Sequence, residues 1–311
     1  MRNTIEYGDM APPTTEPPRV IVPERAAVFA DRARRFAVLA NDHALGDWLR
    51  FLGRLSMAQH AALRALPPVP LPDAAARDRA RSHGMPPLPA RQWPRDAAWR
   101  EALRSIVAEL DNADATDAVR LCCARLAGLS ADRIEALADR VLGSELHGED
   151  AALLPFIAAA LQVYWTALAA GLGGGSRGIA PLDVPGVCPC CGSLPVASIV
   201  RAAGEVGNLR YLHCSLCNTE WNLVRVKCAG CDATTKIAYR YIEGAEPKSI
   251  AAMRAETCDD CMGYLKILYQ EQARDGDPVA DDLATLTLDV MVDEAGYSRI
   301  GPNLLFIPGM P

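Results

Sequence analysis

Four Cys-x-x-Cys pairs in the second half of the chain are the residues whose types and spacing point most directly to chemistry. A Cys-x-x-Cys spacing lets two sulfurs converge on one metal ion from a tight turn, and two such turns supply four thiolates in a tetrahedron. Four pairs therefore predict two complete four-cysteine metal sites. The eight expected ligands are Cys188, Cys191, Cys214, Cys217, Cys228, Cys231, Cys258 and Cys261.

The spacers between successive pairs indicate how the pairs combine. They are 22, 10 and 26 residues long. A spacer of 22 or 26 residues can hold a hairpin that returns the chain, so we expect the first two pairs to form one site and the last two pairs the other. An interleaved arrangement, first pair with third and second with fourth, is the alternative. Four thiolates suit zinc and iron equally in geometry, so the spacing does not choose the metal.

Other uses of clustered cysteines fit this pattern less well. A single Cys-x-x-Cys pair could be a thioredoxin-type redox pair, but here four pairs lie within 74 residues. The length of the chain and the odd total of 11 cysteines disfavour a disulfide framework. No Ser/His/Asp set, phosphate-binding loop or close carboxylate pair stands out. We therefore predict no catalytic residues and no enzyme activity.

The residues that follow the second cysteine of each pair predict tight knuckle turns. Gly192, Asn218 and Asp232 are types that tolerate positive φ, which lets backbone N–H groups point at the sulfurs. Met262 breaks this pattern. Cys190, between two expected ligands, is expected to be an exposed spectator thiol.

The remaining candidates have structural interpretations. Cys122 and Cys123 are expected to be small buried residues of a helix. His213 precedes a cysteine and could replace it as a ligand, but eight cysteines already complete two sites. Trp221 is expected in the core of a ribbon, and Glu220 on the surface of a strand.

The elements that must position these cysteines change character along the chain. Residues 24–172 carry apolar side chains at helical spacing and predict an all-α domain. Ser130 is a plausible N-cap for a helix over residues 131–142, and Gly143 fits its end. The apolar residues at helical spacing are Phe29, Ala33, Phe36 and Ala40; Leu45, Trp48, Leu49, Leu52 and Leu55; and Trp99, Leu103, Ile106, Val107 and Leu110.

One segment is long enough to cross a membrane. Residues 151–172 contain no charge, but eight of the 22 are Ala, and Pro155, Gln162 and Thr166 lower the hydrophobicity further. Positive charge is nearly absent beside it. We expect the central helix of a bundle here and no membrane insertion.

Composition divides the rest of the chain. Residues 1–23 are proline-containing and acidic, have no apolar stretch of a signal peptide, and predict a disordered lead. Residues 173–186 are a Gly/Pro-rich linker. Short β-prone runs follow, so the fold class is α+β: the helical domain precedes one four-cysteine module at residues 187–227 and a second at 228–311. The second module includes an expected helix at residues 281–292. The β-prone runs are residues 196–201, 209–213, 221–227 and 236–242.

The sequence resembles the family of the formate dehydrogenase accessory protein FdhE, and the matches extend well beyond the cysteines. They cover nearly the whole chain after the lead. Cys190 is a departure, because the family's Cys-Pro-x-Cys-Gly motif usually has no cysteine there. The matching runs are residues 83–88 (HGMPPL), 159–163 (AALQV), 188–193 (CPCCGS), 212–221 (LHCSLCNTEW), 254–261 (RAETCDDC), 263–266 (GYLK), 281–284 (DDLA) and 302–305 (PNLL).

The resemblance implies a function that spacing alone does not. It implies a cytoplasmic maturation factor, required for active respiratory formate dehydrogenase, that binds the immature catalytic subunit. It also implies that the two four-cysteine modules are rubredoxin-like and hold iron, with zinc as the alternative metal.

Two other functions compete with this one. A zinc-ribbon protein that binds nucleic acid would show the same cysteine spacing. However, the chain carries a net charge of −6 and residues 188–270 only +1, a poor footprint for phosphates. We therefore expect no nucleic-acid partner. A dithiol oxidoreductase or sulfur carrier would need Cys190 or an unligated pair as its nucleophile.

Overall fold

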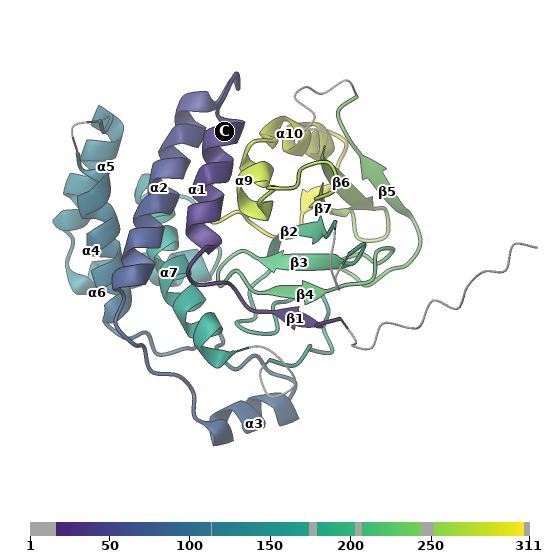
Figure 1. Ribbon diagram of the computed structural model, residues 1–311, viewed down its shortest axis with the longest axis horizontal. Helices are drawn as coiled ribbons and strands as arrows, with labels where there is room; N and C mark the ends of the chain where they lie inside the picture. The colour runs from purple at the N-terminus through teal and green to yellow at the C-terminus, as the bar shows by residue number, and fades with distance from the viewer. Residues whose placement is uncertain (1–16, 113, 174–178, 203–206, 244–251, 308–311) are drawn as a thin grey trace, which may run out of the picture.

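Helices gather on one side of the molecule and a mixed β-sheet on the other (Figure 1). This confirms the α+β fold class. The helices of the first half are α1 Val28–Leu39, α2 Gly46–Ala65, α3 Ala74–Ser82, α4 Ala98–Leu110, α5 Asp117–Ala127, α6 Ala131–Leu142 and α7 Leu154–Leu172. The computed structural model describes residues 17–112, 114–173, 179–202, 207–243 and 252–307.

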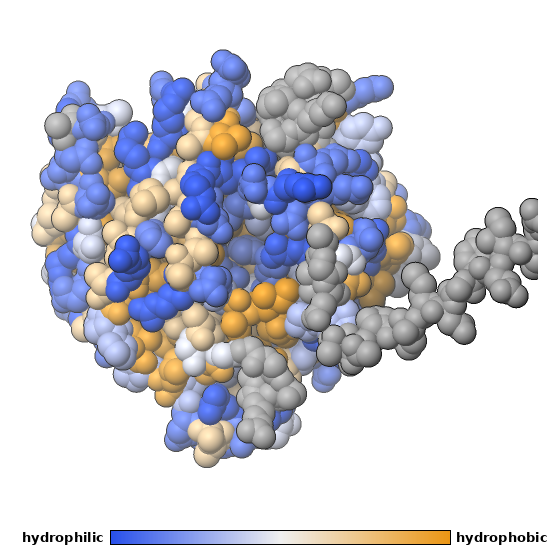
Figure 2. Space-filling view, in the orientation of Figure 1, coloured by the Kyte–Doolittle hydropathy of each residue, from blue (hydrophilic) through white to orange (hydrophobic). Residues whose placement is uncertain are grey.

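The apolar segment is the core helix that its composition predicts. Within Ala151–Leu172, 83% of the most apolar window is buried inside the fold. Helix α7 packs against α2, α4 and α6, so apolar side chains all round it find apolar partners. The face of the molecule in Figure 2 is largely hydrophilic, with hydrophobic areas scattered through it.

Helix α6 begins as expected and ends differently. The Ser130 Oγ accepts a hydrogen bond of 3.3 Å from the backbone N–H of Arg133, which confirms the N-cap. At the other end Gly143 keeps an ordinary φ of −82°, and Ser144 takes the left-handed conformation with φ of 63°.

The two cysteine modules share a single sheet. Its strand order is β1-β4-β3-β2-β7-β6-β5, and β8 also pairs with β7. The first module contributes β2, β3 and β4, the second contributes β5, β6 and β7, and a parallel β2–β7 pair joins them. The strands are β1 Val20–Ile21, β2 Pro195–Val200, β3 Arg210–Cys214, β4 Glu220–Asn222, β5 Ile237–Arg240, β6 Met253–Cys258, β7 Gly263–Tyr269 and β8 Ser298–Arg299.

Strand β1 lies within the segment expected to be a disordered lead. Val20 pairs with Trp221 and Ile21 with Glu220, so this part of the lead forms one edge of the sheet. Residues 1–16 lie outside the described residues. The strand expected at residues 221–227 is also shorter than predicted, because pairing ends at Asn222.

The helix expected at residues 281–292 is two helices, α9 Pro278–Leu283 and α10 Leu286–Glu294. The buried Lys266 explains the break. Its Nζ donates to the backbone carbonyl of Asp282 at 2.6 Å and to that of Thr285 at 3.3 Å. These carbonyls therefore have partners without a continuous helix.

The helices and the first cysteine module share one hydrophobic core. The same cluster of buried residues contains Leu161 of α7, Cys188 and Leu212 of β3. Helix α9 is fastened to α1 as well, because the Arg35 guanidinium donates to the Asp281 carboxylate with Nε–Oδ2 at 2.9 Å. The compositional break at residues 173–186 therefore does not interrupt the packing around the first cysteine group, although residues 174–178 lie outside the described part of the chain.

Candidate metal centres

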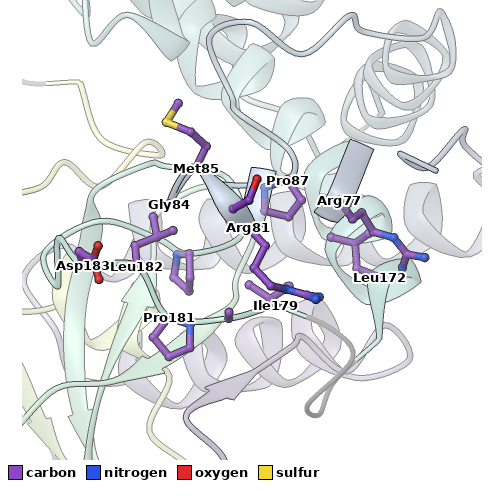
Figure 3. Close-up of a pocket in the computed structure, with 13 residues that line it drawn as sticks. Arg77, Arg81, Gly84, Met85, Pro87, Leu172, Ile179, Pro181, Leu182 and Asp183 are labelled. Atoms are coloured by element: carbon purple, nitrogen blue, oxygen red, sulfur yellow. The ribbon is translucent and has the colours of Figure 1, made fainter. Parts of the chain in front are cut away.

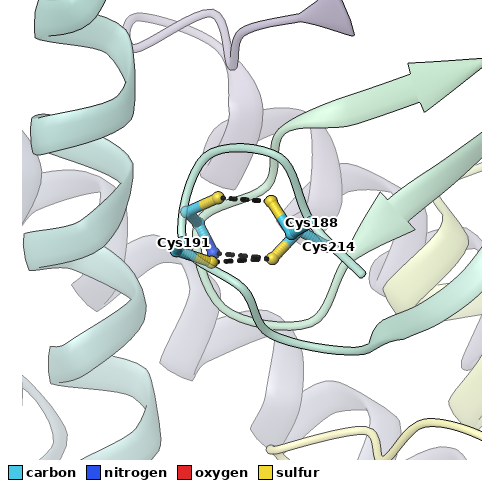
Figure 4. A group of neighbouring side chains, drawn as sticks. Cys188, Cys191 and Cys214 are labelled. Carbon is cyan, nitrogen blue, oxygen red and sulfur yellow. Dashed lines mark hydrogen bonds between the residues drawn. The ribbon is translucent and has the colours of Figure 1, made fainter. Parts of the chain in front are cut away.

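The first four cysteines of the paired set converge in one place. This group, called group 1, consists of Cys188, Cys191, Cys214 and Cys217, whose sulfurs all lie within 4.8 Å of one another. The Sγ–Sγ distance is 3.5 Å between Cys188 and Cys217 and 3.4 Å between Cys191 and Cys214. Figure 4 shows the sulfurs of Cys188, Cys191 and Cys214 turned toward one another from two loops.

The last four cysteines form a second group of the same kind. Group 2 consists of Cys228, Cys231, Cys258 and Cys261. Its Sγ–Sγ distances are 3.7 Å between Cys228 and Cys261 and 3.7 Å between Cys231 and Cys258. The pairs therefore combine sequentially, and the interleaved arrangement is absent from the two groups.

Both groups have the dimensions of a tetrahedral thiolate site. A metal–sulfur bond of about 2.3 Å in a tetrahedron separates neighbouring sulfurs by about 3.8 Å. The close sulfur pairs lie at or slightly below that separation. Either group can thus bind one metal ion through four thiolates without a change of fold, while zinc and iron both remain compatible.

Four knuckle turns bring the sulfurs together. Gly192, Asn218 and Asp232 have φ of 76°, 58° and 65°, as expected from their types. Met262 has φ of 52°, so the expectation that it breaks the pattern was wrong. The turn geometry places this residue in the left-handed region despite its side chain.

Backbone N–H groups point at the sulfurs within these turns. Those of Leu216 and Cys217 lie 3.4 Å from the Cys214 Sγ, and that of Gly230 lies 3.3 Å from the Cys228 Sγ. Such contacts stabilise an anionic thiolate and tune a metal that it holds.

The two groups differ in their exposure to solvent. All four cysteines of group 1 are buried. In group 2 the first cysteine of each pair is buried, whereas Cys231 and Cys261 are exposed.

Cys190 is buried, which contradicts the expectation of an exposed thiol. Its relative exposure is 0%, because the segment before α4 covers the first knuckle. The backbone N–H of Leu88 donates to the carbonyl of Cys190 at 3.1 Å, and that of Ala90 to the carbonyl of Cys191 at 2.9 Å. A hydrogen bond to Cys217, together with burial, raises the pKa of the Cys190 thiol well above its usual range. Cys190 is thus a neutral neighbour of group 1.

The other two thiols belong to neither group. Cys123 is buried in α5 as expected, and burial raises its pKa to about 11. Cys122 is only partly buried, and its Sγ lies 3.8 Å from the carbonyl oxygen of Ala152.

Glu220 is buried, and the expectation of a surface residue was wrong. It is 5% exposed, and its carboxylate lies between His213, with Nδ1–Oε1 at 3.1 Å, and the guanidinium of Arg201. Burial alone would raise the pKa of Glu220, but the hydrogen bond with His213 and the positive charge of Arg201 lower it to about 2.

His213 takes part in this polar network and is not a member of group 1. Its Nε2 lies 3.2 Å from the Oδ1 of Asn218. Trp221 is buried as expected, and its Nε1 donates to the carbonyl of Pro185 at 2.7 Å.

Three polar residues of the helical part support group 1 and were not predicted to do so. The Gln162 Nε2 donates to the carbonyl of Ser215 at 2.8 Å, and the Thr166 Oγ1 accepts from the Asn218 Nδ2 at 2.8 Å. The Arg32 Nη2 donates to the Asn218 Oδ1 at 2.8 Å. Polar side chains inside the otherwise apolar α7 were the signal that pointed to such partners.

Two hollows adjoin this supporting structure. A cavity of about 200 Å³ lies beside α3, and Figure 3 shows Arg77, Arg81 and Asp183 among its lining residues. A larger cleft of about 650 Å³ is lined by residues of α1, β3 and the loop before α9, and His213 and Glu220 are among them.

The fold and these sites together define a class of protein: a helical bundle joined through one core to a sheet that carries two four-cysteine, metal-site-like groups. The models of three family regions match nearly the whole chain. "FdhE, N-terminal" matches residues 17–180, "FdhE, central domain" residues 187–225, and "FdhE, C-terminal domain" residues 226–306. The chain belongs to the FdhE family, the formate dehydrogenase accessory proteins.

Individual relatives agree with this assignment. A "Protein FdhE homolog" of Pseudomonas aeruginosa is 38% identical over 309 residues, covering 99% of each chain. "Protein FdhE" of Escherichia coli O139:H28 is 37% identical over 302 residues, covering 97% of this chain and 93% of the relative. The crystal structure of the FdhE protein from Pseudomonas aeruginosa superposes with a TM-score of 0.83 at 39% identity, covering 94% of this chain and 100% of that chain.

Proposed function

We propose that the protein is a cytoplasmic maturation factor that binds the immature catalytic subunit of a respiratory formate dehydrogenase. It acts as a binding protein, and no step of formate oxidation is assigned to its residues. The observation that supports this most strongly is the pair of four-cysteine groups set in a chain that matches the FdhE family from residue 17 to residue 306.

We propose further that each four-cysteine group holds one iron ion as a rubredoxin-like site. Iron bound by four thiolates supplies one-electron redox chemistry, whereas zinc would supply structure alone. The protein's own contribution is the positioning of the sulfurs by the knuckle turns and the N–H groups directed at Cys214 and Cys228.

Deletion of the gene tests the maturation role. The deletion strain should lose respiratory formate oxidation while it still makes the catalytic polypeptide. Restoring the gene should restore activity, and a copy with Cys214→Ser and Cys217→Ser should not. Normal formate oxidation in the deletion strain would overturn the proposal.

Binding and metal content need separate measurements. A tagged copy of the protein should co-purify the catalytic subunit that lacks its finished cofactor in preference to the mature enzyme. Protein purified without air should contain two metal ions per chain and, after oxidation, show the absorption of ferric thiolate. Two zinc ions and no colour would overturn the assignment of iron and leave the maturation role to the genetic test.

A further inference from the structure

We propose that the two four-cysteine groups have different roles: group 1 holds a permanent structural metal ion, and group 2 holds an exchangeable one. The exchange partners are soft donors such as the thiolates of small molecules or of another protein. This inference rests on the metal-binding part of the proposed function. It follows from the surroundings of the two groups, which have the same ligands and nearly the same sulfur geometry.

Group 1 is closed off from solvent on several sides. Its four cysteines are at most 1% exposed. The segment before α4 lies over the first knuckle through the N–H groups of Leu88 and Ala90, and α7 reaches the second knuckle through Gln162 and Thr166. An incoming ligand must displace these contacts before it reaches a metal–sulfur bond.

Group 1 also belongs to the main hydrophobic core. Its four cysteines are part of the same cluster as α7 and the other helices, whereas none of the group 2 cysteines belongs to a core cluster of the described residues. Loss of a metal from group 1 would leave up to four negative or newly protonated sulfurs inside apolar surroundings. Metal release there is therefore coupled to opening of the core.

Group 2 is open at one sulfur of each pair. Cys231 and Cys261 are exposed, whereas Cys228 and Cys258 are 2% and 1% exposed. Its rim is polar and carries both signs of charge: the Lys236–Asp260 pair at 2.8 Å borders one knuckle. Water-soluble ligands can approach the two outer sulfurs without any change in the packing of the helices.

This geometry allows metal exchange one ligand at a time. As a donor of the incoming ligand bonds to the metal, the bond to the Cys231 or Cys261 sulfur breaks, and the released thiolate stays in water or takes a proton from it. No electron is transferred in this substitution. The buried Cys228 and Cys258 hold the ion until the outer bonds have been replaced.

The test uses the full-length protein loaded with two zinc ions and exposed to excess EDTA together with iodoacetamide. Native mass spectrometry should show one ion leaving at least about tenfold faster than the other, because an exposed thiolate reacts without local unfolding. Peptide mapping should place the early label on Cys231 and Cys261, and the label on group 1 only with the slow phase. Equal release rates, or earlier labelling of group 1, would overturn the inference.

Matched variants assign the two phases. Cys261→Ser should abolish the fast phase and leave one slowly released ion, while Cys217→Ser should remove the slow ion or the folded protein. Labelling of the unaltered protein decides the question even when Cys217→Ser does not fold. A protein that binds no zinc at all contradicts the metal sites of the proposed function and this inference with them, a result distinct from equal release rates.

Discussion

Asn218 and Thr166 are joined by a buried hydrogen bond of 2.8 Å, from Nδ2 to Oγ1, that ties the second knuckle of group 1 to the central helix. The Oδ1 of the same amide accepts from Arg32 and faces His213. A residue that the chain needs for its φ of 58° thus also connects three elements far apart in the sequence.

Replacement of Asn218 should therefore destabilise the protein far more than replacement of its counterpart in group 2. We expect Asn218→Ala to lower the free energy of unfolding by about 3 kcal/mol, because it removes a hydrogen-bond partner from the buried Arg32 and Thr166. The exposed Asp232 has the same positive φ and pairs with Lys227 at the surface, so Asp232→Ala should cost about 1 kcal/mol. Urea unfolding of the metal-loaded variants measures both, and similar losses would contradict the assigned role.

The buried Glu220 should make stability depend on pH in the acid range. Its pKa is lowered from 4.5 to about 2, so the stabilisation is fully present above pH 4.5 and is lost as the pH falls toward 2. The shift corresponds to about 3 kcal/mol. Glu220→Gln should lose this contribution at neutral pH and flatten the fall in stability below pH 4.5.

The measurement compares urea unfolding of Glu220→Gln and the parent protein from pH 7 to pH 3. Glu101→Gln is a suitable control, because Glu101 forms an exposed pair with Arg104 within α4. Parallel pH profiles for Glu220→Gln and the parent would show that Glu220 does not carry the effect.

The pair Arg35–Asp281 fastens α9 to α1 in a nearly water-free setting, with the side chains 6% and 1% exposed. Burial raises the pKa of Asp281, and the Arg35 charge opposes this rise. Arg35→Met should cost about 3–5 kcal/mol because it leaves a buried carboxylate without its cationic partner. Arg35→Met with Asp281→Asn should recover part of the loss.

The neighbouring Arg34 provides the comparison for this experiment. It pairs with Asp31 on the outside of α1, and both side chains are more than half exposed. Arg34→Met should change the unfolding free energy by less than about 1 kcal/mol. An effect as large as that of Arg35→Met would indicate a general loss of helix α1 rather than loss of the buried pair.

Gln162 offers a test of the link between α7 and group 1. Gln162→Leu removes the donor to the carbonyl of Ser215 and should cost about 2 kcal/mol, because that carbonyl then loses its buried partner. It should also speed the release of metal from group 1. Gln272→Leu, at an exposed position, should leave both quantities unchanged, and the same measurements on both variants decide the matter.

Local features of the structure could be predicted where one residue type meets one physical requirement. The spacing of the cysteines predicted both groups, and the side chain of Ser130 predicted the start of α6. Lack of charge over residues 151–172 predicted a core helix.

Features that depend on packing between distant segments could not be predicted in the same way. Glu220 reads as a polar strand residue until Arg201 and His213 surround it, and Cys190 reads as a surface thiol until the Leu88 segment covers it. The break between α9 and α10 depends on Lys266 of β7, which no local pattern places beside those carbonyls. Met262 shows the reverse case, in which the turn overrides the preference of the residue.

The strand order has a consequence for how the chain is made. The sheet begins with Val20–Ile21 of β1 and pairs that strand with β4, about 200 residues later, while β2 waits for β7. A ribosome must therefore release most of the chain before either partner can be found. During synthesis the apolar α7 segment emerges before the sheet that helps to cover it, so the sheet of this protein closes only after β7 has been translated.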